Sequence, residues 1–138
     1  MTRALKTSGF LGLTVMMVVG MYQHSLTAAG GGAPGWMVGG HAHLGVLSIL
    51  AIVMGFAVDA FALTGTLRSA VTGLFVVGQW LLPVSVWVGV GLGVTVLLPT
   101  VFVWGVCLIA AMLVMAWQAV TTDLDGGSST RGVTPADD

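Results

Sequence analysis

Four long apolar stretches, separated by short polar or glycine-rich segments, dominate the sequence. They cover about 8–28, 40–63, 69–91 and 96–120. Each is long enough to cross the hydrocarbon core of a bilayer as an α-helix, which takes about 20 predominantly apolar residues. Only 7% of the 138 residues are charged, against roughly 25% in an ordinary soluble domain. The sequence therefore predicts an all-α integral membrane four-helix bundle over 1–120, embedded in a lipid bilayer, and a polar, disordered tail over 121–138.

The first apolar stretch admits two interpretations. Basic residues precede it, and the small residues Ala28 and Ala29 follow it, which is also the pattern of a signal peptide and its cleavage site. The apolar run is longer than a typical signal core. We therefore expect a retained first helix, with a cleaved signal peptide as the alternative.

The basic residues indicate how the helices cross the membrane. Arg3 and Lys6 precede the first apolar stretch, Arg68 lies between the second and third, and Arg131 lies in the tail. Because basic residues gather on the cytoplasmic side, we expect a multi-pass plasma-membrane protein with both termini in the cytoplasm. Asp59 lies near the cytoplasmic end of the second stretch, where Arg68 is its nearest predicted partner. A net charge of -1 provides no basic surface for nucleic acid.

The chain has three histidines, and the predicted topology brings all of them near the outer face. His24 lies near the end of the first stretch, which runs outward, and His41 and His43 lie near the beginning of the second, which runs back. A polar ring within a membrane is costly without a partner, so we expect a functional role. Residues two apart on an α-helix are rotated by about 200°, so His41 and His43 should serve different neighbours. This argues against a compact zinc site, whose helical ligands stand three or four apart.

The second stretch also has features that suit a large planar cofactor. A heme needs an axial imidazole, an apolar slot and closely approaching backbones. Small residues beside the histidines are Gly45, Ser48, Ala51 and Gly55. Because small residues serve plain helix packing equally well, the spacing fits a heme site without being diagnostic of one.

A local resemblance bears on this pattern. Residues 39–56 read Gly-Gly-His-Ala-His-Leu-Gly-Val-Leu-Ser-Ile-Leu-Ala-Ile-Val-Met-Gly-Phe. This segment resembles the tenth transmembrane helix of the catalytic subunit of heme-copper oxidases and nitric oxide reductases. In that family a His-X-His pair opens the helix and ligates two hemes on opposite sides of it. The resemblance implies that His41 corresponds to the ligand of the high-spin heme and His43 to one ligand of the low-spin heme.

The departures from that family are large. Its catalytic subunit has about twelve helices in three four-helix arcs, whereas this chain has four predicted helices. The sequence contains no adjacent His-His pair and no His-X-X-X-Tyr, so the residues for the copper or non-heme iron and the cross-linked tyrosine are missing. Whether the chain is an oxidoreductase in its own right is therefore left open.

Four helices nevertheless match the size of one arc. A homo-oligomer, and a homotrimer in particular, could rebuild the three-arc ring, since head-to-tail contacts close into rings when the rotation permits. In such a ring His24 could supply a second axial ligand to a heme held by His43 or His41 of the same or a neighbouring chain. We expect a b-type heme protein that acts in electron transfer or in binding O2 or NO, with a quinol as one conceivable electron donor.

Two other functions remain open. The first is a non-catalytic small subunit of a larger membrane complex, in which the histidines only form hydrogen bonds. The second is a copper-binding membrane protein, because thioether with imidazole suits Cu(I). The methionines that flank the histidines are Met16, Met17, Met21 and Met37. Met21 or Met37 could also be an axial heme ligand.

The remaining marked positions have a structural and a functional interpretation. Gln79 and Trp80 lie in the middle of the third stretch, one turn before Pro83, and could bridge helices or line a cofactor slot. We expect the proline to kink the helix. Tyr22 could donate a hydrogen bond to a heme propionate, but an interfacial anchor is the simpler interpretation, as it is for Trp36.

Overall fold

The computed structural model describes residues 2–122, and all regular structure in this part of the chain is helical. The elements are α1 (Thr2–Ala28), α2 (Gly35–Ala60), α3 (Gly65–Val86), the π-helical turn η1 (Trp87–Gly91), the 3₁₀ turn η2 (Thr95–Leu97) and α4 (Thr100–Thr121). Four helices, with η1 extending α3 and η2 preceding α4, are long and apolar enough to cross a membrane. This confirms the predicted all-α, four-helix architecture. The predicted tail from residue 123 onward, with Arg131, lies outside the described residues.

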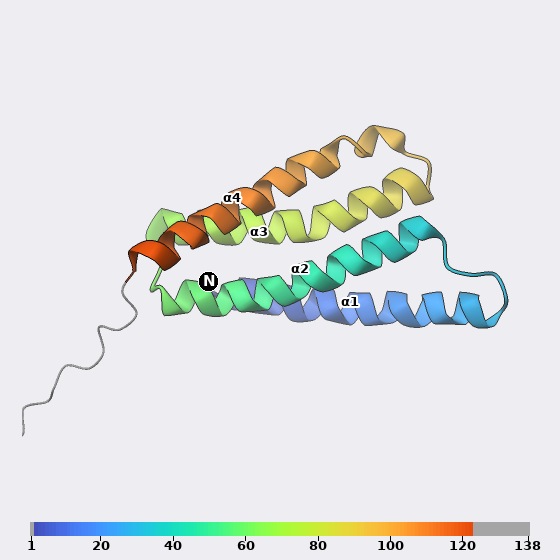
Figure 1. Ribbon diagram of the computed structural model, residues 1–138, viewed down its shortest axis with the longest axis horizontal. Helices are drawn as coiled ribbons and strands as arrows, with labels where there is room; N and C mark the ends of the chain where they lie inside the picture. The colour runs from blue at the N-terminus through green and yellow to red at the C-terminus, as the bar shows by residue number, and fades with distance from the viewer. Residues whose placement is uncertain (1, 123–138) are drawn as a thin grey trace, which may run out of the picture.

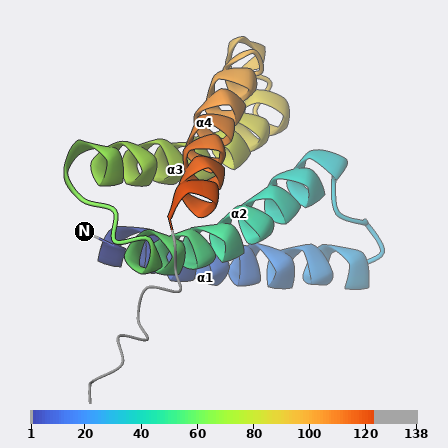
Figure 2. The same cartoon turned by 60° about the vertical axis from the view of Figure 1, so that its left-hand side comes forward.

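The helices form two antiparallel hairpins, α1–α2 and α3–α4 (Figures 1 and 2). The most extensive contacts are those within each hairpin, and α2 against α3 forms most of the contact between the hairpins. α4 packs mainly on α3. Its outward side chains are therefore uncovered, and Phe102, for example, is 80% exposed.

The observed helix boundaries differ from the expected ones by several residues. α1 begins six residues earlier than predicted, and α2 begins at Gly35 instead of 40 because Pro34, with φ -59°, stands at its N-cap. α2 ends at Ala60 instead of 63, since the chain reverses through Ala62 and Gly65, both with positive φ. Hydropathy delimits the part of a helix that lipid can cover, whereas the hydrogen-bonded helix continues until the backbone turns.

Glycines set the close packing of α1 on α2. A Cβ atom at Gly12 would collide with Ser48, and one at Gly20 would lie 3.0 Å from Cε1 of His41. From α2, a Cβ at Gly45 would collide with the Met16 sulfur. Small residues let helix backbones approach closely, so this pairing fixes the antiparallel register of the first hairpin.

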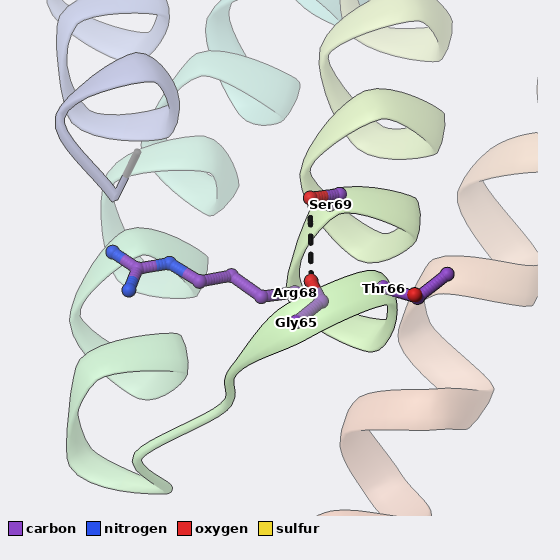
Figure 3. A pocket seen from close by; sticks show the side chains of 4 residues that line it. All are labelled: Gly65, Thr66, Arg68 and Ser69. Atoms are coloured by element: carbon purple, nitrogen blue, oxygen red, sulfur yellow. Dashed lines mark hydrogen bonds between the residues drawn. The ribbon is translucent and has the colours of Figure 1, made fainter.

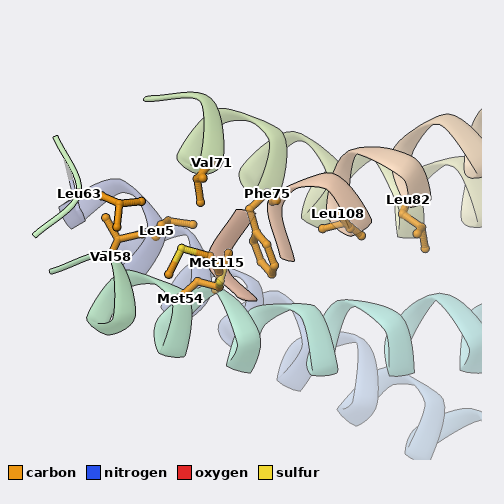
Figure 4. Packing of buried hydrophobic residues seen from close by; sticks show 11 residues of the cluster. Leu5, Met54, Val58, Leu63, Val71, Phe75, Leu82, Leu108 and Met115 are labelled. Carbon is orange, nitrogen blue, oxygen red and sulfur yellow. The ribbon is translucent and has the colours of Figure 1, made fainter. Parts of the chain in front are cut away.

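The buried core runs between the hairpins from the start of α1 toward the middle of α3 and α4 (Figure 4). Phe75 of α3 is its largest fully buried side chain, at 1% exposure. Its other buried members are Leu5, Ala51, Met54, Val58, Leu63, Val71, Leu82, Leu108, Ala111 and Met115. The core therefore lies mainly in the half of the bundle that contains the first residues of α1.

Candidate functional site

The three histidines lie at one end of the bundle, where α1 ends and α2 begins. We call this the histidine end, defined by His24, His41 and His43. The opposite end contains Lys6, Asp59 and Arg68, and we call it the charged end. The antiparallel pairing of α1 and α2 places all three histidines at this end, and their position near the outer membrane face stays a prediction.

His41 faces the interior of the first hairpin. Its ring packs beside Gly20 of α1, where a methyl group would already be in tight contact. Its Nδ1 atom is buried and has no hydrogen-bond partner. Helix α1 thus packs directly against one side of this ring.

His43 is turned away from α1 and is exposed. Its Nδ1 lies 2.7 Å from the main-chain oxygen of Gly39, one turn earlier in α2. Because a carbonyl can only accept, the Nδ1 ring nitrogen is the donor, and in the neutral imidazole this arrangement makes Nε2 the acceptor. The 200° rotation predicted from the sequence therefore places the two imidazoles against different surroundings.

The surface beside His43 is apolar. A cavity of about 240 Å³ is lined by this residue with Ala42, Val46 and Leu47. Leu47 also lines a larger groove of about 380 Å³ between α2, α3 and α4. The other residues of that groove are Leu50, Phe75, Leu108, Ile109, Met112, Leu113 and Ala116. An apolar surface therefore extends from His43 toward the middle of the bundle.

His24 is exposed near the end of α1. Within residues 2–122, no three His, Cys, Asp or Glu side chains come close enough together to hold a metal ion. A single chain therefore offers separate imidazoles and not a three-histidine centre, and the predicted ligand roles of His24, His41 and His43 stay predictions.

A second cavity at the histidine end has aromatic walls. It measures about 240 Å³ and is lined by Val19, Tyr22, Trp36, Met37 and Trp87. Sequence reasoning marked Tyr22, Trp36 and Met37 separately but did not single out Trp87, because nothing local indicates that η1 returns to the beginning of α2. Met21, also a candidate, is exposed.

Gln79 and Trp80 form a polar network in the middle of the bundle. Gln79 is 0% exposed, and its Nε2 donates to the Ser8 main-chain oxygen and the Ser48 hydroxyl, both at 3.1 Å. The Ser8 hydroxyl donates to Oε1 of Gln79 at 2.8 Å and accepts the Trp80 indole N–H at 2.8 Å. The structure thus gives this pair a helix-bridging arrangement across α1, α2 and α3. Pro83, one turn on, lies inside α3, which continues to Val86.

Ion pairs mark the charged end. The Lys6 ammonium lies 2.9 Å from the Asp59 carboxylate, and the Arg68 guanidinium lies 3.9 Å from it. The sequence-based pairing of Asp59 with Arg68 is confirmed, but the closer partner, Lys6, was missed. Lys6 and Asp59 are 53 residues apart in the sequence, and only the packing of α1 against α2 brings them together.

A polar pocket at the start of α3 is lined by Gly65, Thr66, Arg68 and Ser69, and their side chains do not converge (Figure 3). Arg68 extends toward the first hairpin, whereas Thr66 extends toward α4. The Ser69 hydroxyl donates to the main-chain oxygen of Gly65 at 3.3 Å. These side chains serve the helix start and the ion pairs, so the histidine end remains the candidate site.

Fold and site together describe an all-helical protein with four helices of membrane-spanning length and imidazoles at one end. The whole chain, residues 1–138, matches the family model described as a domain of unknown function, DUF8059, and the protein belongs to that family. No curated protein and no solved structure matches the chain.

Proposed function

We propose that this protein is a multi-pass plasma-membrane protein that binds a b-type heme through His43 and serves electron transfer or the binding of a small gas such as O2 or NO. The observation that carries the proposal is the hydrogen bonding and the exposure of the His43 ring. One nitrogen is tied to the Gly39 carbonyl at 2.7 Å, while the side chain remains exposed beside an apolar surface.

This arrangement is the one that metal-ligating histidines commonly adopt. In such a histidine, one ring nitrogen binds the metal, and the other donates its N–H to a carbonyl, which fixes the tautomer and the ring orientation. The apolar residues Val46 and Leu47 next to His43 suit the face of a porphyrin. His41 fits less well, because its ring packs against Gly20 of α1. A bound heme would supply reversible one-electron chemistry at its iron.

The exposed side of His43 supports an oligomeric site. A heme resting on this surface would project beyond the chain, so a second chain would be needed to enclose it. His24, which is also exposed at the histidine end, is our candidate for the sixth ligand from a neighbouring chain. The proposed assembly is a homo-oligomer, with a trimer as the preferred form. Without a sixth ligand the iron would be open to a gas.

The proposed orientation places the histidine end at the outer face. The described basic residues Arg3, Lys6 and Arg68 lie toward the charged end or in its immediate neighbourhood, as the positive-inside tendency requires of a cytoplasmic side. A cysteine introduced at Thr27 should react with an impermeant maleimide added to intact cells, and one at Thr64 should not. The reverse labelling pattern would invert the proposed orientation.

An absorption spectrum of detergent-purified protein, before and after dithionite, tests the heme itself. Sharp reduced α and β bands are expected for a six-coordinate b-type heme, and a broad band for a five-coordinate one. A colourless preparation from heme-replete cells would remove the proposal.

One observation favours copper as a second candidate. The Met16 sulfur packs on Gly45, and the His41 ring packs on Gly20, so thioether and imidazole occupy adjoining layers of the same hairpin. The Nδ1 atom of His41 has no hydrogen-bond partner. Copper in stoichiometric amount in the same preparation, without heme, would favour a Cu(I) protein instead.

A further inference from the structure

The aromatic cavity at the histidine end is lined by other residues than the surface beside His43. Its aromatic rings come from three elements, Tyr22 from α1, Trp36 from α2 and Trp87 from η1. Val19 and Met37 complete the lining. The cavity is large enough for a small organic group and is walled by rings together with an aliphatic side chain and a thioether.

The two tryptophan rings are held in place by glycines on each other's element. The Trp87 indole packs directly against Gly40 of α2, and its N–H donates to the Met37 main-chain oxygen at 3.4 Å. In return, the six-membered ring of Trp36 packs on Gly91, where a Cβ atom would lie 2.9 Å away. This reciprocal packing holds the two tryptophan walls of the cavity before any ligand arrives, so a ligand would not have to order these two rings.

The charge of a ligand determines whether it suits these aromatic walls. The face of an aromatic ring has a negative quadrupole and attracts cations. Among the described residues, the charged side chains Arg3, Lys6, Asp59 and Arg68 all lie outside the cavity lining, so no resident ammonium occupies the rings. A hydrated cation such as Na⁺ would need oxygen ligands, which the lining side chains provide only at the Tyr22 hydroxyl.

We propose that the cavity of Tyr22, Trp36 and Trp87 binds a trimethylammonium group. Such a group is positively charged and yet covered with methyl groups, so it needs no hydrogen-bond acceptors and suits apolar aromatic walls. The group could belong to a free molecule such as choline or to the headgroup of a choline lipid. This site is separate from His43 and does not depend on heme.

Titration with choline, followed by the indole N–H signals of the full-length protein in detergent, tests the proposal. The chain has five tryptophans, so the signals can be assigned by single substitutions. Choline should shift the Trp36 and Trp87 signals saturably. Its neutral isostere, 3,3-dimethylbutan-1-ol, should bind about tenfold more weakly, since it lacks the charge.

Substitutions of single aromatic residues test whether choline binding depends on the rings of this cavity. Tyr22→Leu removes one ring from an exposed position and should weaken choline binding by about tenfold, whereas Tyr22→Phe should retain it. Trp117→Leu, which changes an exposed tryptophan of α4 outside the cavity, is the matched control and should bind as the unmodified protein does. Equal affinity for choline and the isostere, or no saturable shift of Trp36 and Trp87, would overturn the proposal.

Nanodiscs distinguish the two sources of the group. If the site takes a lipid headgroup, the Trp36 and Trp87 signals should differ between phosphatidylcholine and phosphatidylglycerol discs, and free choline should shift them only in the latter. If it takes a free molecule, choline should shift them equally in both. Either pattern supports a trimethylammonium site, and failure of choline to act in phosphatidylglycerol discs would contradict it.

Discussion

The charged end and the histidine end of the bundle are held together in different ways. At the charged end, buried side chains such as Leu5, Val58 and Val71 interlock, and ion pairs flank them. At the histidine end, rings rest on glycines, and a buried imidazole nitrogen lacks a partner. The contrast indicates that most of the apolar core packing lies toward the charged end, whereas the histidine end contains the buried nitrogen without a partner and the aromatic cavity.

Truncating the core near the charged end should have the largest effect on stability. Phe75→Ala removes a fully buried ring, so we expect a loss of about 3 to 5 kcal/mol of unfolding free energy. Thermal unfolding in detergent, followed by circular dichroism, measures it. Phe102→Ala is the matched control, because Phe102 is exposed on α4 and its loss should change little. Equal effects of the two substitutions would contradict the location of the core.

Breaking the network in the middle of the bundle should have an intermediate effect. Gln79→Leu leaves the Ser8 and Ser48 hydroxyls without their bridging amide, and we expect a loss of about 1 to 3 kcal/mol. Gln118→Leu on α4, outside this network, is the control. If Gln79→Leu raised the unfolding temperature, the amide would destabilise the fold, and this result would contradict a stabilising role for its hydrogen bonds.

The Gln79 network also shows how far the sequence can be interpreted. An amide in the middle of an apolar helix predicts a bridge to another helix, but its partners, 31 and 71 residues away, depend on helix pairing. The four helices were predictable because lipid-compatible length is a local property. The position of Trp87 was not predictable, since it depends on η1 reaching the start of α2. The His-X-His spacing indicates His43 as a candidate ligand, but its bond to Gly39 depends on the side-chain rotamer that it adopts in α2.

The ion pairs of the charged end should contribute less than its apolar core. Asp59→Asn weakens the pairing with Lys6 and Arg68, but these side chains are partly exposed, so we expect a loss below about 1 kcal/mol. High salt should reduce this difference further. A loss as large as that of Phe75→Ala would show that charge, and not packing, holds this end together.

The smallest change in unfolding free energy is expected for a substitution at the histidine end. His41→Leu replaces a ring whose buried Nδ1 has no partner with an apolar side chain, so stability should stay the same or rise by about 1 kcal/mol. The same unfolding assay applies, with Leu44→Ala, a buried neighbour on α2, as a destabilising comparison. Marked destabilisation by His41→Leu would mean that His41 is a satisfied structural residue.

The heme content of purified His43→Ala and His41→Ala, set beside the unmodified protein, tests the central claim most directly. Because His43 is exposed with its Nδ1 bonded to Gly39, whereas the His41 ring packs against Gly20 of α1, His43→Ala should lose the heme bands and His41→Ala should retain them. Full heme occupancy with an unchanged spectrum in His43→Ala would contradict the assignment.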